Sequence, residues 1–262
     1  MGYEIINGDC LLEMPRLIER GVTVDAVVTD PPYSEHVHGK SRRGGSLPDA
    51  GDFRACISRA RELGFDAITA PEIKASSRNF AALCAKWTLA FSDIESCHLW
   101  REAMTEAGLD YARTGVWVKL NATPQFTGDR PAAAVETITI AHGKGRKSWN
   151  GGGSHAVWHH PIVINRGGNN PRNHTTEKPV ELMRDLIRLF SNPGDTILDA
   201  YAGSFTTGVA CVIEGRNFIG IERDAHYCEV GEARIKRAQG IPAEVPRLNR
   251  RLIETPLFNE RA

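Results

Sequence analysis

Residues 196–208 read TILDAYAGSFTTG and carry the strongest signal of the fold class in this sequence. Its β-branched and apolar start predicts a short buried strand that ends at Asp199. The small residues after it predict a tight turn, and a helix is expected over Thr206–Glu214. The next apolar run, 217–221, predicts a second strand, which closes on Glu222. Residues 196–222 are therefore predicted to form a strand–helix–strand unit of a parallel sheet.

The turn of this unit is suited to a ligand. Small residues let the backbone approach a ligand closely, and the following helix begins with free N–H groups. Glu222 lies 23 positions after Asp199, where an acidic side chain can bind ribose hydroxyls. The turn has only Gly203 and Gly208, so the three-glycine dinucleotide fingerprint is missing. An ordinary tight turn without a ligand is the alternative.

A second candidate site follows the predicted strand Val24–Thr29. Asp30-Pro31-Pro32-Tyr33 comes directly after it, at the strand end where open α/β sheets hold ligands. The two prolines fix the backbone so that the Asp30 carboxylate and the Pro31 carbonyl can face one point, which suits an NH₂ donor. Tyr33 offers a ring on which a planar base can stack. A rigid turn with a packed tyrosine is the alternative.

The other periodic segments continue the alternation of helices and strands. We expect helices at about 74–86, 94–107, 180–190 and 227–239, and strands at 87–91, 112–119 and 135–141. This order predicts a doubly wound, mostly parallel, Rossmann-like sheet. With 262 residues, the chain is long enough for one such domain over 1–262 with a small insertion.

Charge patterning limits the partners of the chain. Its 32 basic and 32 acidic residues give a net charge of zero, so an anionic partner must be held by a local basic patch. The window 142–173 has no acidic residue and holds five basic ones. We interpret it as an irregular insertion with a basic face, with a solvated loop as the alternative. Residues 34–52 are rich in glycine, serine and charge and predict a mobile surface loop.

The two motifs together resemble the DNA amino-methyltransferases that use S-adenosylmethionine. The tetrapeptide at 30–33 precedes the turn at 199–208, as in the permuted beta class of that family. Residues 7–10, 117–119 and 174–179 add to the resemblance, which extends over about 5–235. The family usually has glycine where this chain has Phe205, and this phenylalanine is expected to narrow the turn.

The resemblance implies a role for each motif residue. Those expected to bind S-adenosylmethionine are Asp9, Cys10, Lys178, Asp199, Ala200, Gly203, Ser204, Thr206 and Glu222, with Lys178 neutralising its carboxylate. Those expected to act on a flipped base are Asp30, Pro31, Pro32 and Tyr33. Holding both N–H bonds of the exocyclic amine localises its lone pair for attack on the methyl group. No cysteine follows a proline, which disfavours cytosine C5 methylation, and the leading Asp favours adenine N6 over cytosine N4.

The expected partner is double-stranded DNA. The segment 142–173 is expected to recognise the target, with help from the loop 34–52. The basic residues expected to contact DNA are Lys40, Arg42, Arg43, Lys144, Arg146, Lys147, Arg166 and Arg172. The resemblance also implies a homodimer and an association with restriction–modification.

Several other interpretations remain open at this stage. They are a nicotinamide-dependent oxidoreductase, a catalytically silent DNA-binding protein, and a methyltransferase acting on RNA or protein. We expect no metal site, although histidine pairs at 36–38 and 159–160 suggest zinc as an alternative. No secretory signal and no membrane span are evident, so a cytoplasmic protein of bacterial or phage type is expected.

Overall fold

A single eight-stranded sheet forms the centre of the molecule in the computed structural model, which describes residues 2–33, 67–124, 128–163 and 177–240. The strand order is β1-β8-β7-β2-β3-β5-β4-β6. The pairing makes β5 the one strand of the eight that runs against the others. The strands are β1 (Tyr3–Asn7), β2 (Val24–Thr29), β3 (Cys84–Ser92), β4 (Asp110–Lys119), β5 (Val135–His142), β6 (Val157–His160), β7 (Thr196–Asp199) and β8 (Asn217–Glu222). The mostly parallel, Rossmann-like sheet expected from the sequence is confirmed.

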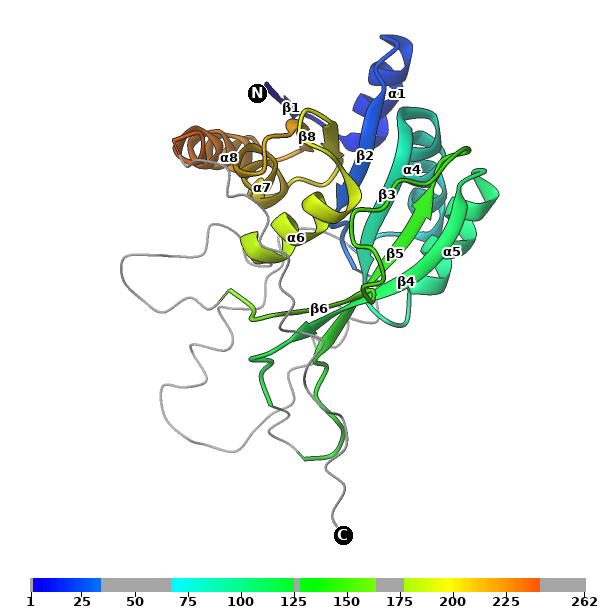
Figure 1. The fold of residues 1–262 in the computed structure, drawn as a ribbon, viewed down its shortest axis with the longest axis vertical. Helices are drawn as coiled ribbons and strands as arrows, with labels where there is room; N and C mark the ends of the chain where they lie inside the picture. The colour runs from blue at the N-terminus through cyan, green and yellow to red at the C-terminus, as the bar shows by residue number, and fades with distance from the viewer. Residues whose placement is uncertain (1, 34–66, 125–127, 164–176, 241–262) are drawn as a thin grey trace.

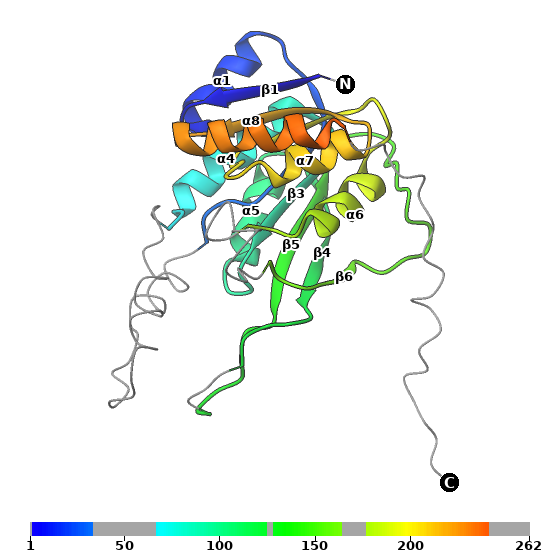
Figure 2. The ribbon, with the colours of Figure 1, turned by 90° about the vertical axis from the view of Figure 1, so that its left-hand side faces the viewer.

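Helices cover both faces of this sheet (Figure 1). One layer contains α1 (Cys10–Glu19), α4 (Ala70–Leu83) and α5 (Cys97–Glu106). The other contains α6 (Val180–Phe190), α7 (Thr206–Ile213) and α8 (Ala225–Ala238). A separate apolar core fills the space under each layer, as expected for a doubly wound fold. Figure 2 shows β4 and β5 extending beyond the helical layers at one end.

Local sequence signals explain where the helices begin. Thr69 caps α4 through a capping box, in which its hydroxyl accepts from the Glu72 N–H and the Glu72 carboxylate accepts from the Thr69 N–H. Asp9 caps α1 and Asp224 caps α8, each by accepting an N–H two residues on. Strands β1 and β6 and helix α1 were not expected from the sequence. Pro15 lies inside α1, and because proline usually ends a helical pattern, the sequence did not indicate this helix.

The order of strands in the sheet determines where a ligand can bind. Strand β2 lies between β3 and β7. From β2 the chain continues to β3 on one side, and β7, much later in the sequence, pairs with β2 on the other side. The gap beyond the carboxyl ends of β2 and β7 is thus the topological switch point, the usual ligand position in such sheets. Asp30 follows β2 and Asp199 ends β7, so both predicted motifs meet there.

The segment 142–173 is not one separate insertion. Its β6 adds to the sheet beside β4, with Trp117 of β4 opposite Trp158. Residues 143–156 connect the end of β5 to this strand, and the segment beyond 163 lies outside the described residues. The segment therefore belongs partly to the core of the main domain.

Candidate active site

A cavity of about 560 Å³ opens at the switch point. Every predicted site residue of the two motifs lines it, and so do Asp9, Cys10 and Lys178. The volume is in the range of small-molecule sites. The structure thus brings together residues from the two ends of the chain that the sequence could only list separately.

Asp199 lies at the base of the cavity and has hydroxyl partners on both sides. Its Oδ1 accepts from the Thr29 hydroxyl at 2.7 Å and its Oδ2 from the Thr207 hydroxyl at 2.5 Å. Burial raises the pKa of Asp199 to about 6 despite these bonds. Among the described residues it forms no ion pair, so a ligand cation beside it would be stabilised.

Glu222 fixes the turn that follows Asp199. Its Oε2 accepts from the Gly203 N–H at 2.8 Å, and its Oε1 accepts from the Asp224 N–H at 2.8 Å. Burial raises the pKa of Glu222. A carboxylate at the rim of the cavity with acceptor capacity left can bind a vicinal diol.

Cys10 and Tyr201 form another part of the cavity wall. Burial raises the pKa of the Cys10 thiol to about 12, so it stays neutral and serves as a small apolar surface. The Tyr201 hydroxyl pairs with the Ser76 hydroxyl at 2.8 Å, which ties the turn to α4. The side chain of Asp9 is used as the cap of α1, accepting from the Leu11 N–H at 2.8 Å.

A cluster of charged groups surrounds the predicted tetrapeptide. The Lys178 ammonium donates to Asp30 Oδ2 at 2.6 Å, lies 3.1 Å from Glu136 Oε2, and donates to the Tyr33 hydroxyl at 3.2 Å. The Tyr33 hydroxyl in turn donates to Glu136. Lys119 pairs with the other oxygen of Glu136 at 2.7 Å. The cluster therefore contains two carboxylates and two ammonium groups, all within one wall of the cavity.

The environment moves the acid–base equilibria of this cluster. Burial would raise the pKa of Glu136, but the two lysines beside it lower that pKa to about 2. Burial and the nearby Glu136 charge raise the pKa of Asp30, although Lys178 opposes them. The two carboxylates raise the pKa of Lys178 in spite of its burial. Glu136 is thus firmly ionised, and Asp30 is the carboxylate that can more easily take up a proton.

Two features of this cluster were not found from the sequence. Lys178 was expected to face the carboxylate of the cofactor, whereas its ammonium is held by Asp30 and Glu136. Glu136 was not singled out at all. It is the one acidic residue of a strand that is otherwise apolar or uncharged at neutral pH, which was the available signal, since buried charges are rare unless paired.

Phe205 does not narrow the turn, in contrast to the expectation. It adopts a left-handed backbone conformation with φ 62° and ψ 35°, a region that favours glycine, the residue that the resemblance implied at this position. Its side chain is completely buried, packs edge-on against Phe218, and is absent from the cavity lining. Gly220 and Gly231 make room for the ring, because a Cβ on either would lie within 2.6 Å of it.

Replacing Gly231 by alanine should therefore destabilise the protein. The new Cβ would lie 2.1 Å from the Phe205 ring, and such overpacking costs about 1–3 kcal/mol of unfolding free energy. Urea unfolding of Gly231→Ala measures this loss. Gly153→Ala, where no atom lies within 4 Å of the new Cβ, is the matched control and should unfold like the parent protein. Equal stability of the two variants would contradict this account of Phe205.

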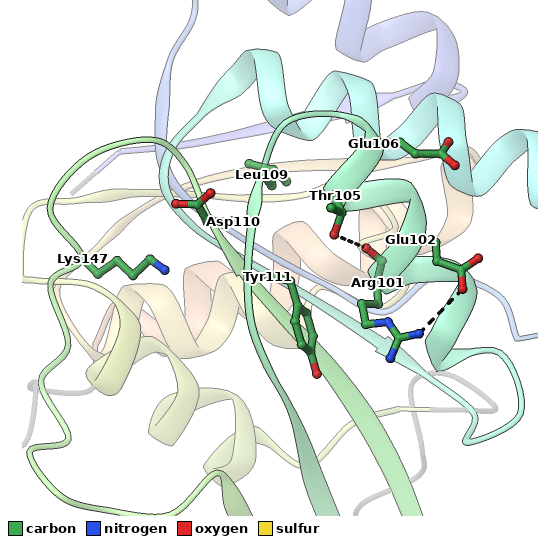
Figure 3. Close-up of a pocket in the computed structure, with 8 residues that line it drawn as sticks. All are labelled: Arg101, Glu102, Thr105, Glu106, Leu109, Asp110, Tyr111 and Lys147. Atoms are coloured by element: carbon green, nitrogen blue, oxygen red, sulfur yellow. Dashed lines mark hydrogen bonds and ion pairs between the residues drawn. The ribbon is translucent and has the colours of Figure 1, made fainter.

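Three of the predicted DNA-contact residues lie away from the cavity. Lys144, Arg146 and Lys147 follow β5, whose last residue His142 pairs with Trp87 near the start of β3. The eight residues of β5 place its two ends about 24 Å apart, at about 3.4 Å per residue. Lys147 lines a separate hollow beside α5 and the start of β4 (Figure 3). This placement argues against contacts of these three side chains with the nucleotides around a base held in the cavity.

The remaining predicted DNA contacts lie outside the described residues. They are Lys40, Arg42, Arg43, Arg166 and Arg172. The described residues that flank their segments, however, all line the cavity: Tyr33 and Ala67 on one side, Val163 and Glu177 on the other. Both segments are therefore attached at the cavity.

The described residues contain neither a group of metal ligands nor a membrane-spanning helix. Within 2–33, 67–124, 128–163 and 177–240, no three His, Cys, Asp or Glu side chains are grouped as a metal site requires. His160, one of the candidate zinc ligands, instead pairs with Asp185 at 2.8 Å. No helix in the described part of the chain has both the length and the apolar character needed to cross a membrane.

Two proteins of known sequence are similar to this chain over very different lengths. The Type II methyltransferase M.HinfI of Haemophilus influenzae is 25% identical over 268 residues, covering 94% of this chain and 71% of that protein. The DNA adenine methyltransferase YhdJ of Escherichia coli K12 is 47% identical over 72 residues, which are 28% of this chain and 24% of YhdJ.

Solved structures share the fold. The M1.HpyAVI–SAM complex superposes with a TM-score of 0.63 at 22% identity, over 89% of this chain and 99% of that one. The cytosine-N4-specific PvuII DNA methyltransferase superposes with a TM-score of 0.66 at 15% identity, over 92% of both chains.

A family model settles the assignment of the chain. The DNA methylase model N6_N4_Mtase matches residues 24–233, a range that contains both the tetrapeptide and the turn at Asp199. Because that match covers most of the sequence, this protein belongs to the N6/N4 family of DNA methylases, which use S-adenosylmethionine as the methyl donor.

Proposed function

We propose that this DNA methylase transfers the methyl group to N6 of an adenine that is flipped out of duplex DNA. The observation that carries the proposal is the position of Asp30 and Tyr33 at the switch point, in one cavity with Asp199 and Glu222. An acceptor for an amine and a platform for a base thus lie beside groups suited to the methyl donor.

The residues around the turn fit S-adenosylmethionine. Asp199 would bind the ammonium group of S-adenosylmethionine. This ammonium would be the counter-ion of the buried carboxylate, which has none among the described residues. Glu222 would hold the ribose hydroxyls, while Cys10 and Asp9 would lie along the adenine ring. Gly203, Ser204 and Thr206 would form the backbone cradle, with Ala200 as a close-fitting wall.

The tetrapeptide would hold the target base. The Asp30 carboxylate, whose Oδ1 has no hydrogen-bond partner among the described residues, and the Pro31 carbonyl would accept the two amine hydrogens. Pro32 keeps the backbone rigid between Pro31 and Tyr33. Tyr33 would stack on the base, and its ring is kept in place because its hydroxyl donates to Glu136.

Contacts to DNA would come from the segments attached at the cavity. The segment that contains Lys40, Arg42 and Arg43 begins after Tyr33, and the segment with Arg166 and Arg172 ends before Glu177. Their guanidinium and ammonium groups would bind phosphates on either side of the flipped base. A homodimer remains part of the proposal, as does the cytoplasmic location expected from the sequence.

Adenine is proposed as the target base over cytosine. The matched segment of YhdJ belongs to a protein named as a DNA adenine methyltransferase, and the leading Asp of the tetrapeptide agrees with it. Cytosine N4 is the second candidate, because the PvuII enzyme has the same fold and is named as cytosine-N4-specific. Both bases present an exocyclic amine next to a ring nitrogen, so the same acceptors serve either.

Transfer of labelled methyl groups to unmethylated duplex DNA, followed by nucleoside analysis, tests the proposal. We expect the label in N6-methyldeoxyadenosine, with duplex DNA a better acceptor than RNA of the same sequence. Label in N4-methyldeoxycytidine would overturn the choice of base. Bound cofactor without transfer to DNA would contradict the proposed reaction itself.

A further inference from the structure

We propose that Glu136 and Lys178 are positioning residues of the methyl-transfer step: Lys178 fixes the Asp30 carboxylate, and Glu136 fixes both Lys178 and the Tyr33 ring. Neither residue needs to touch the target base. The proposal rests on the proposed function of Asp30 as the acceptor of the target amine.

The contacts form a closed set. Lys178 reaches Asp30 at 2.6 Å, Glu136 at 3.1 Å and Tyr33 at 3.2 Å, and its side chain is only 8% exposed. The ammonium also lies 5.1 Å from the Phe91 ring centroid and 5.9 Å from that of Trp117. Three polar partners and surrounding rings leave it a single orientation, so the Asp30 oxygen that it binds is fixed as well.

Glu136 joins the two halves of the cluster. Its Oε2 accepts from Tyr33 and faces Lys178, while its Oε1 pairs with Lys119 at 2.7 Å. Loss of the Glu136 carboxylate would remove both the acceptor of the Tyr33 hydroxyl and one counter-ion of the Lys178 ammonium. The stacking ring and the amine acceptor are therefore held by the same side chain.

The charge arrangement lets Asp30 change its protonation state. With Glu136 ionised, Lys178 keeps a buried counter-ion even when Asp30 is neutral. The other Asp30 oxygen, Oδ1, is buried with no hydrogen-bond partner among the described residues, which makes the charged form costlier. Both features favour Asp30 as a proton acceptor.

The transfer forms one bond to the methyl carbon and breaks one. The amine lone pair forms the new N–C bond while the methyl–sulfur bond of S-adenosylmethionine breaks and its electron pair goes to sulfur. The methylated amine carries one surplus proton, which passes to a carboxylate oxygen of Asp30. Lys178 stays protonated throughout, paired with Glu136.

Several charged groups surround Asp30 and its partners Tyr33 and Glu136. Glu136 on β5, Lys178 before α6 and Asp199 at the end of β7 interact with Asp30 itself, whereas Lys119 on β4 acts on Glu136 and Asp93 after β3 acts on Tyr33. Of these, Glu136 is the negative group that raises the pKa of Asp30 most. Removing its charge should therefore lower the pKa of Asp30.

Carboxyl ¹³C NMR of the free protein tests this without any turnover. Signals are assigned by their loss in Asp30→Asn and Glu136→Gln. In the parent protein, Asp30 is expected to titrate above its ordinary pKa of 3.8, and Glu136 near 2. In Glu136→Gln the Asp30 titration should move to lower pH. An Asp30 that titrates at or below 3.8 in the parent protein would overturn the inference.

Kinetics provide the second test. Glu136→Gln keeps the shape of the side chain and should lower kcat about 10- to 100-fold, as for other groups that orient a reacting side chain. Its KM for S-adenosylmethionine should stay unchanged, and the acid limb of the kcat–pH profile should move to lower pH. Glu136→Asp, which keeps the charge, should leave that limb in place. Glu102→Gln, in the distant hollow of Figure 3, is the neutral control.

The outcomes separate this inference from the proposed function. If Glu136→Gln retains the parent kcat and acid limb while Asp30→Asn is inactive, the inference is wrong and the proposed function stands. If Asp30→Asn is as active as the parent protein, the proposed function fails. If Glu136→Gln does not fold, the Asp30 titration in the parent protein and the kcat–pH profile of Glu136→Asp still test the inference.

Discussion

Asp30→Asn is expected to lower kcat for methyl transfer to DNA by about 10²- to 10⁴-fold, the range for removal of a general base. The amide can accept a hydrogen bond from the amine but cannot take up its proton. Binding of S-adenosylmethionine should be preserved within a few-fold, since Asp199 and Glu222 are unchanged. Isothermal titration with the cofactor and single-turnover methyl transfer measure the two effects.

The fold should tolerate this change, because Lys178 keeps Glu136 as a counter-ion at 3.1 Å. Asp25→Asn provides the matched control, as Asp25 lies at the opposite end of the same strand, β2. It should lose no more than a small part of the activity. A kcat for Asp30→Asn within a few-fold of the parent value would rule out Asp30 as the proton acceptor.

Lys178→Met should cause the largest loss of stability, about 3–5 kcal/mol of unfolding free energy near pH 8. Methionine fills a similar volume among the rings but leaves the Asp30 and Glu136 carboxylates without the cation between them. At least one of these carboxylates should then have a pKa raised above its unfolded value. Since the folded state binds the extra proton, the loss should shrink as the pH falls toward that raised pKa. Urea unfolding at pH 8 and pH 5.5 measures it.

A second lysine offers a matched control for this variant. Lys86 also bridges two carboxylates, Asp25 at 2.8 Å and Asp195 at 3.2 Å, but its side chain is 32% exposed. Lys86→Met should cost only about 1 kcal/mol, because solvent screens an exposed pair. Equal losses of unfolding free energy in the two variants would show that burial of the cluster does not determine the size of the loss. A loss in Lys178→Met that is the same at both pH values would show the same.

The parent protein should show the opposite pH dependence at Glu136. Its folded pKa of about 2 lies below the ordinary value of 4.5, so its contribution to stability is complete above pH 4.5 and is lost as the pH falls toward 2. In Lys178→Met this contribution should largely disappear.

The local elements were predictable because they depend on residues close together in the sequence. The helix at 180–190 has the bounds that its periodicity predicts, and the strands at β2, β7 and β8 differ by at most one residue from expectation. Strand β6 was missed because its four residues, VWHH, have no pattern that separates a strand from a loop. The resemblance likewise identified Asp30 and Asp199, since both stand at fixed positions within recognisable turns.

The sequence by itself determined that two strand-end turns, at Asp30 and at Asp199, carry the residues of the site. Only the tertiary structure decided that β2 pairs with β7, which brings Thr29 within 2.7 Å of Asp199 across 170 residues. It also decided that Lys178 and Glu136 meet at Asp30, and that the reversed direction of β5 places Lys144 at the end of the strands opposite the cavity. The physical reason is that strand order and direction arise from packing between distant segments, whereas turns and helices arise from their immediate neighbours.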